Sequence, residues 1–327
     1  MKATAVASLL FALFIRVIPA HAFDTFVSRT GSDANPCTQA SPCATFERAV
    51  SQTTEFGMIR CLDSGNFAPG TFLIDRSLTI DCTGIGGLLG GGVLLANNAN
   101  LQVTLRGLII DGRGTSAIGV FYGGTSQAGS GSLRIENCRI SGFRDLAGGG
   151  GPGISGIGIR FEPPANSTLK LYVIDTVFAD NGLAASGGAI VIKPVGSSTA
   201  HVELTRVVME RNTYGLFANG TNSTGVIAVQ IRDSVIGSNT FNGVSAFTTA
   251  GAATTSITFD RSSSNLNGGA GILSQGPSAF VFLGNSTVMG NGTGLNAVSG
   301  GHILSYQNNQ LTGNVSDGAP TGVLTVR

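Results

Sequence analysis

The sequence has no tryptophan, only four tyrosines among 327 residues, and few charges. Charged residues make up 11% of the chain, against a usual value of about 25%, and the formal net charge is +1. Proteins that bind nucleic acid need a basic surface for the phosphates, and those that bind single strands also need aromatic rings for the bases. We therefore expect no nucleic-acid partner.

Long apolar runs are lacking after the N-terminal segment. Lys2 precedes an apolar stretch that ends near Ile18, and the small-residue triplet Ala20-His21-Ala22 follows. This pattern is typical of a secretory signal peptide and is too short for a stable membrane span. We expect residues 1–22 to be removed and the mature chain to be periplasmic or secreted, without a membrane span.

What the chain does contain is a repeat of eleven residues. Apolar residues alternate at its start, a polar or small pair follows, an apolar residue returns, and Asn comes last in every copy except the first. The copies occupy residues 133–143, 171–181, 202–212, 229–239, 257–267, 281–291 and 304–314. Their last positions are 23 to 38 residues apart, which is the length of one coil in a solenoid.

The repeat predicts a single all-β domain. Most copies are followed by glycine and a second alternating run, and no helical period is sustained after residue 55, which excludes a helical solenoid. The coils are too long for a hexapeptide left-handed helix. We expect a right-handed parallel β-helix over residues 56–327, with three short strands in each coil.

The N-terminal residues 23–55 are expected to cap this helix. An open solenoid end exposes core and strand edges, so it needs a cover. Thr45 is a candidate N-cap, and Phe46, Ala49 and Val50 would share one face of a short helix.

Stacking of the coils predicts two columns of polar side chains. The repeated asparagine should form one column, because stacked amides can hydrogen-bond along the axis and Asn tolerates the left-handed backbone of a sharp bend. Three residues before the returning apolar position, the charge alternates in sign on four coils, which indicates a structural column rather than a catalytic one. The residues are Asn181, Asn212, Asn239, Asn267, Asn291 and Asn314, and Asp175, Arg206, Asp233 and Arg261.

All five cysteines lie before residue 140. Cys37 and Cys43 bracket a short loop, and Cys61 and Cys82 are separated by about one coil, so an exported chain should form these two disulfides and leave Cys138 buried and free. A zinc site is the alternative for four cysteines. No CxxC spacing is present, however, so we expect no metal and no cofactor.

Three segments resemble a known family. FVSRTGSDANPCTQASPCATFERAV (26–50), NGTNSTG (219–225) and LSYQNNQLTGN (304–314) are similar to exported right-handed parallel β-helix repeat proteins of soil and plant-associated proteobacteria, in the pectin-lyase-like superfamily. The resemblance implies the fold and export. It implies no activity, because that family has none assigned.

No catalytic residue can be assigned from the sequence. The calcium-binding acidic set of pectate lyases and the NTD, DD, GHG and RIK motifs of polygalacturonases are absent, and no carboxylate pair for glycoside hydrolysis can be identified. Charge is densest between residues 106 and 180, which also contain the longest coil. The candidate binding residues there are Asp111, Glu136, Arg139, Arg144, Asp145 and Arg160. The alternative is that they are ordinary polar residues of outward strand positions.

Three functions remain open at this stage. The first is a non-catalytic module that binds polysaccharide along one flat face of the solenoid, the face expected to carry Asp111, Glu136, Arg139, Arg144 and Arg160. The second is a polysaccharide lyase or hydrolase with an unrecognised site, and the third is a structural or adhesin-like protein. Fold alone does not choose among them.

Overall fold

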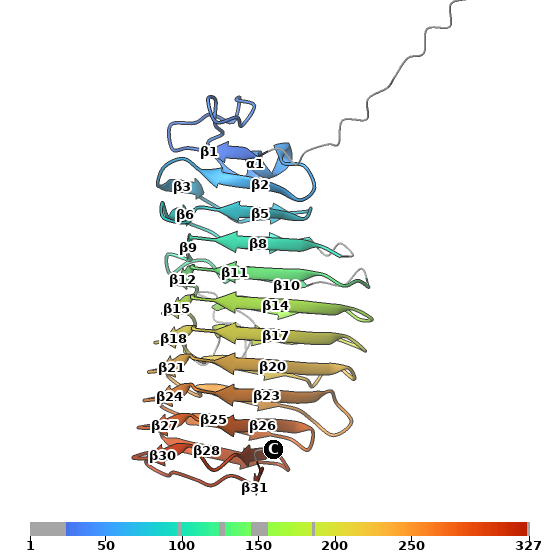
Figure 1. The fold of residues 1–327 in the computed structure, drawn as a ribbon, viewed down its shortest axis with the longest axis vertical. Helices are drawn as coiled ribbons and strands as arrows, with labels where there is room; N and C mark the ends of the chain where they lie inside the picture. Colours follow the sequence, from blue (N-terminus) through green and yellow to red (C-terminus); the bar gives the residue numbers. More distant parts are fainter. Residues whose placement is uncertain (1–23, 97–99, 124–127, 145–155, 185–186, 326–327) are drawn as a thin grey trace, which may run out of the picture.

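The computed structural model describes residues 24–96, 100–123, 128–144, 156–184 and 187–325. Within these residues the chain forms one helix and 31 strands, and every strand pairing is parallel (Figure 1). The signal-peptide residues and Asp145 lie outside the described residues. The chain is a right-handed parallel β-helix, as the repeat predicts.

Three sheets run along the axis, and we name them A, B and C in the order in which each coil meets them. Sheet A contains β1 (Thr25–Val27), β2 (Gly57–Cys61), β5 (Leu78–Asp81), β8 (Gln102–Arg106), β11 (Ser132–Glu136), β14 (Thr168–Ile174), β17 (Thr199–Thr205), β20 (Val226–Arg232), β23 (Thr254–Asp260), β26 (Ala279–Gly284), β29 (His302–Ser305) and β31 (Gly322–Val323). Sheet B contains β3 (Gly65–Ala68), β6 (Gly87–Leu89), β9 (Leu108–Asp111), β12 (Arg139–Ser141), β15 (Val177–Ala179), β18 (Val208–Glu210), β21 (Val235–Gly237), β24 (Ser263–Asn265), β27 (Thr287–Met289) and β30 (Gln310–Thr312). Sheet C contains β4 (Phe72–Ile74), β7 (Val93–Leu95), β10 (Ile118–Gly123), β13 (Ile157–Glu162), β16 (Gly188–Ile192), β19 (Leu216–Asn219), β22 (Val244–Phe247), β25 (Ala270–Gln275) and β28 (Thr293–Val298).

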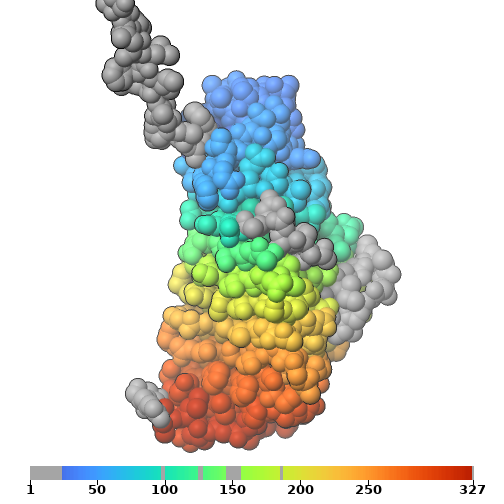
Figure 2. All heavy atoms as spheres, turned by 90° about the vertical axis from the view of Figure 1, so that its right-hand side faces the viewer, coloured from blue at the N-terminus to red at the C-terminus, as the bar shows by residue number. Residues whose placement is uncertain are grey.

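Alternation along each strand separates the core from the surface. In β14, Leu169, Leu171 and Val173 are buried, whereas Lys170 and Tyr172 lie on the outside. Equivalent residues of successive coils are in register, so each apolar position stacks on its own kind. The coils form layers along the long axis, which Figure 2 shows as successive bands of colour. A polar position in the repeat therefore becomes a column on the surface.

The helix α1 (Phe46–Gln52) covers the first coil. Thr45 is its N-cap, since the Thr45 hydroxyl accepts a hydrogen bond from the Arg48 backbone N–H at 3.1 Å. Phe46, Ala49 and Val50 are buried, and the Phe46 ring packs against Phe67 and Phe72. The predicted capping helix is confirmed. Sheet A nevertheless starts inside the segment assigned to the cap, because β1 pairs with β2.

Both expected disulfides are formed. Cys37 is bonded to Cys43 and Cys61 to Cys82, with Cα–Cα distances of 4.6 and 4.9 Å. The second bond joins the last residue of β2 to the residue that follows β5, its neighbour in sheet A. Cys138 is free and buried, and burial raises the pKa of its thiol to about 12. A thiol with so high a pKa is unreactive in the folded protein.

The six asparagines lie in one column at the turn between sheets B and C, and each amide bonds the next. Asn181 donates to Asn212 at 2.9 Å, Asn239 donates to Asn267 at 2.9 Å, and the other steps are 2.9 to 3.2 Å. The left-handed backbone expected at Asn lies instead one residue earlier, for example at Asp180, whose φ is 59°. The bend precedes Asn because the asparagine side chain itself turns inward to the core.

The alternating charges lie at the opposite end of sheet B, on its turn with sheet A. They form two pairs rather than a continuous chain: Arg206 bonds Asp175 at 2.6 Å, and Arg261 bonds Asp233 at 2.9 Å. All four residues have positive φ, from 45° to 52°, and their side chains are exposed. This position is therefore a backbone bend whose side chains project into water.

Candidate functional site

The predicted binding residues do not share one face. Glu136 is on sheet A, Asp111 and Arg139 are on sheet B, and Arg160 is on sheet C. Arg144 follows β12 at the turn between sheets B and C. The expectation of a single face was wrong, because one coil turns through three sheets and a cluster in sequence becomes a ring around the axis.

Three of these residues are engaged in local interactions, and Asp111 accepts a hydrogen bond from the Arg113 backbone N–H at 2.9 Å. Glu136 accepts hydrogen bonds from Arg106 at 2.5 Å and from Arg134. Desolvation would raise the pKa of Glu136, but the two guanidinium groups outweigh it and hold that pKa below its usual range. Arg160 pairs with Glu162 at 2.8 Å and lies over the Phe121 ring, 5.4 Å from its centroid.

The outer face of sheet A carries a line of adjoining depressions. A proximal groove of about 230 Å³ is lined by residues of β8, β11 and β14, including Gln102, Lys170 and Tyr172. A central groove of about 240 Å³ lies on β17, β20 and β23, and a terminal hollow of about 500 Å³ lies beside β23, β26 and β29. The central groove and the terminal hollow share Gln230 and Thr258. From β8 to β29 there are seven inter-strand steps, or about 34 Å.

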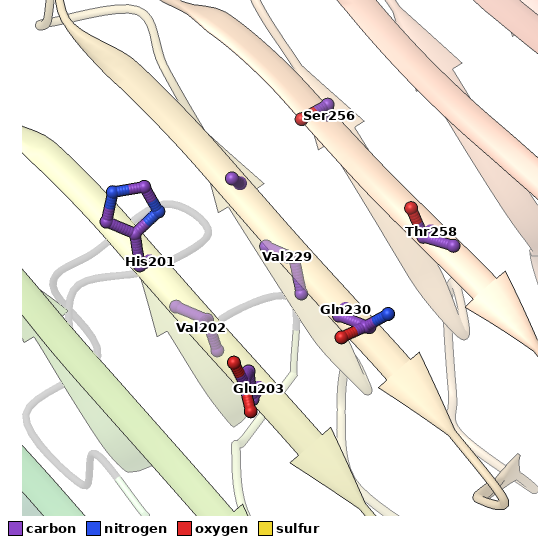
Figure 3. Close-up of a pocket in the computed structure, with 8 residues that line it drawn as sticks. His201, Val202, Glu203, Val229, Gln230, Ser256 and Thr258 are labelled. Atoms are coloured by element: carbon purple, nitrogen blue, oxygen red, sulfur yellow. The ribbon is translucent and has the colours of Figure 1, made fainter.

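Hydrogen-bonding side chains border the central groove (Figure 3). His201 and Glu203 come from β17, Gln230 from β20, and Ser256 and Thr258 from β23. His201 and Glu203 are exposed and the other three are half-buried. The groove exists because Ala228 stands in register between His201 and Ser256, where neighbouring coils have larger side chains.

The terminal hollow has a different composition. Its lining includes the Tyr306 ring, the Asp260 carboxylate and the Asn285 and Asn308 amides around Gly284. This region lies outside the residues singled out from the sequence, because those were chosen for charge, whereas the region is rich in aromatic and amide side chains. The available signal was the segment from Ala279 to Asn308, where Phe280, Phe282 and His302 occupy outward positions of two adjacent strands and Tyr306 directly follows the second strand.

Two features of the ionisable side chains bear on catalysis. No three His, Cys, Asp or Glu side chains gather to hold a metal ion in the described part of the chain. Where the pKa of a described carboxyl is displaced, as at Asp75, Asp81, Glu136, Asp175 and Asp233, it is lowered. A general acid for glycoside hydrolysis needs a raised pKa. No helix of the described residues is long and apolar enough to cross a membrane.

Comparison with known proteins leaves the family open. No family model and no curated protein matches the sequence. Among solved structures, the chain is similar to the pectate lyase Pel9A, with 13% identity, a TM-score of 0.35, and coverage of 86% of this chain and 74% of that one. It is also similar to the GH136 lacto-N-biosidase from Eubacterium ramulus, with 10% identity, a TM-score of 0.30, and coverage of 92% and 67%. Both structural similarities have low TM-scores, so the fold assignment rests on the strand pairings.

Proposed function

We propose that this protein is an exported β-helix that binds an extended polysaccharide along the outer face of sheet A and does not cleave it. The observation that carries the proposal is the line of three depressions that follows the axis for about 34 Å. A straight face with a regular repeat suits a linear polymer. Export is supported by the leader pattern of residues 1–22 and by two disulfides.

The side chains along this line match the chemistry of sugars. Hydroxyl groups both donate and accept hydrogen bonds, and His201, Glu203, Gln230, Ser256 and Thr258 offer both functions on one surface. The depressions are shallow and remain open to water, so each contact displaces bound water and gains little free energy. We therefore expect weak affinity that grows with the length of the oligomer.

The state of the carboxyl groups supports binding without cleavage. The most enclosed carboxylate on this face, Glu136, is held ionised by Arg106 and Arg134, so it cannot supply a proton to a leaving group. Its neighbour Asp81 is also stabilised as an anion. These groups organise the face and do not form an acid–base pair.

The test compares two double variants by calorimetry with pectin, alginate and cellulose-derived oligomers. The double variant His201→Ala with Gln230→Ala removes two hydrogen-bonding side chains from the lining of the central groove. It should weaken binding about tenfold or more. Arg139→Ala with Arg144→Ala removes exposed charge away from sheet A and should leave binding unchanged. Equal losses in both variants, or none in the first, would contradict the proposal. Reducing or unsaturated ends that accumulate with time would show that the protein is an enzyme instead.

A further inference from the structure

The terminal hollow lies around a glycine, Gly284. Gly284 ends β26 at an outward position of sheet A that earlier coils fill with Asp81, Arg106, Glu136, Ile174, Thr205 and Arg232. In the preceding coil the position is filled by Asp260, which is in register with Gly284. A Cβ atom at Gly284 would lie 3.2 Å from Cδ2 of Tyr306. The missing side chain therefore lets the Tyr306 ring pack directly over the Gly284 backbone, where it forms part of the lining of the hollow.

One side of the hollow is formed by the Tyr306 ring. Tyr306 is half-buried and is the aromatic residue of the lining, whereas Phe280 and His302 stack farther along the same face, outside the lining, with centroids 4.7 Å apart and planes 10° apart. An aromatic face carries a negative quadrupole and attracts the weakly positive C–H groups on the flat side of a pyranose ring. The ring also has few torsions to order on binding, so it is a suitable anchor.

The opposite wall is a chain of oriented polar groups. Asn308 Nδ2 donates to Asn285 Oδ1 at 2.9 Å, and Asn285 Nδ2 donates to Asp260 Oδ1 at 2.9 Å. Arg261 donates to the other oxygen of Asp260 at 2.7 Å. The carboxylate is thus fixed in place, and each of its oxygens retains a lone pair able to accept a hydroxyl proton.

We propose that the terminal hollow is a subsite for one neutral pyranose unit, stacked on Tyr306 and hydrogen-bonded to Asp260 and Asn308. The proposal rests on the proposed function and names its preferred ligand, a neutral polysaccharide. A uronic acid fits less well, because its carboxylate would face Asp260 in a hollow where Arg261 is already paired with that residue. The hollow lies at one end of the line of grooves. The sugar unit held there would anchor the bound polymer at that end.

The test uses calorimetry with cellohexaose, xylohexaose and mannohexaose as neutral probes and hexagalacturonate as the anionic one. Tyr306→Ala removes the stacking face, and Gly284→Thr fills the hollow with a side chain that Thr205 already carries at the same position of another coil. Each should weaken binding of the preferred neutral hexamer about tenfold. Tyr306→Phe keeps the ring and should lose much less. Unchanged thermal unfolding of Gly284→Thr shows that the loss is local.

The outcomes separate this inference from the proposed function. If neither Tyr306→Ala nor Gly284→Thr weakens binding while the His201 and Gln230 double variant does, the subsite is overturned and the proposed function stands. Tighter binding of hexagalacturonate than of every neutral hexamer also overturns the subsite. A parent protein that binds no oligomer overturns both.

Discussion

Both turns that flank sheet B carry a polar residue that repeats along the coils, but this residue is buried at one turn and exposed at the other. The asparagine column between sheets B and C is buried, with Asn212, Asn239 and Asn267 at most 2% exposed. The acid–base column of Asp175, Arg206, Asp233 and Arg261 lies between sheets A and B and is exposed. Hydrogen bonds shielded from water are costly to lose, whereas exposed ion pairs exchange easily with solvent. Burial, rather than repetition, should therefore decide which column holds the fold.

A third column lies just inside the acid–base column and sharpens this contrast. Thr176, Ser234, Ser262 and Ser286 are buried one residue after the bend, and we call them the serine column. The Ser262 hydroxyl accepts from the Ser234 backbone N–H at 3.1 Å, and the Ser286 hydroxyl accepts from the Ser262 N–H at 3.2 Å. Each hydroxyl also donates to a carbonyl of its own coil. The buried hydroxyl groups thus stabilise the turn from its inner side, whereas the ion pairs lie on its exposed side.

The largest effect is expected from breaking the asparagine column at its middle. Asn239→Ala removes the amide that accepts from Asn212 and donates to Asn267 and to the Met209 carbonyl. Several buried groups then lack partners, and we expect a loss of about 3 kcal/mol in the free energy of unfolding, measured by urea denaturation. Asn296→Ala on the outside of β28 is the control and should change little. A loss below about 1 kcal/mol in Asn239→Ala would contradict the comparison.

A smaller loss is expected in the serine column. Ser262→Ala leaves the Ser234 N–H without its acceptor, so the free energy of unfolding should fall by about 1 to 2 kcal/mol. The adjacent Ser263→Ala is a matched control, because Ser263 points outward on β24 and is half-buried. Equal effects of the two substitutions would show that the inner hydroxyl is not a support of the turn.

The half-buried Glu136 should give an intermediate effect that depends on pH. Its pKa is lowered in the folded state, so its contribution is present above the ordinary carboxyl pKa of about 4.3 and is lost as the pH falls through the lowered value. Glu136→Gln should cost about 1 kcal/mol at pH 7 and less at pH 3, because the carboxylate becomes protonated as the pH falls. Thermal unfolding at both pH values checks this.

A double-mutant cycle provides the control for that result. In an Arg106→Met background, Glu136 retains only Arg134 as a charged partner, so the cost of Glu136→Gln at pH 7 should shrink. A cost that stays the same in both backgrounds, or that grows toward low pH, would exclude the ion pairs as its cause.

The smallest effect is expected for the acid–base column itself. Arg206→Met removes the partner of Asp175 but leaves the buried Val207 and its backbone bond to Ser234 in place. The urea midpoint should shift less than for Ser262→Ala, and the shift should decrease further in high salt, because the pair is exposed. A shift as large as that of Asn239→Ala would mean that exposed pairs, and not burial, fix the register of the coils.

Much of this architecture could be predicted from the sequence, because it depends on local periodicity. Alternation within strands and recurrence of Asn every coil are properties of the chain itself, and stacking in register converts them directly into sheets and columns. The helix at Phe46–Gln52 and the pairing of Cys61 with Cys82 follow from the same spacing rules. Even so, the bend at Asp180 was expected one residue later, since sequence alone does not show which residue turns its side chain inward.

The line of grooves proposed as a binding surface could be located only from the tertiary structure. Glu136, Arg139 and Arg160 are close in sequence and occupy three different sheets, whereas His201, Gln230 and Ser256 are each about one coil apart and border one groove. The terminal hollow depends on Gly284 lying in register with Asp260 and beneath Tyr306. A surface on a solenoid is assembled along the axis, from single residues contributed by many coils. The depth of a groove depends on which of the residues in register on adjacent coils has a small side chain. That residue can be identified only when the register of the coils is known.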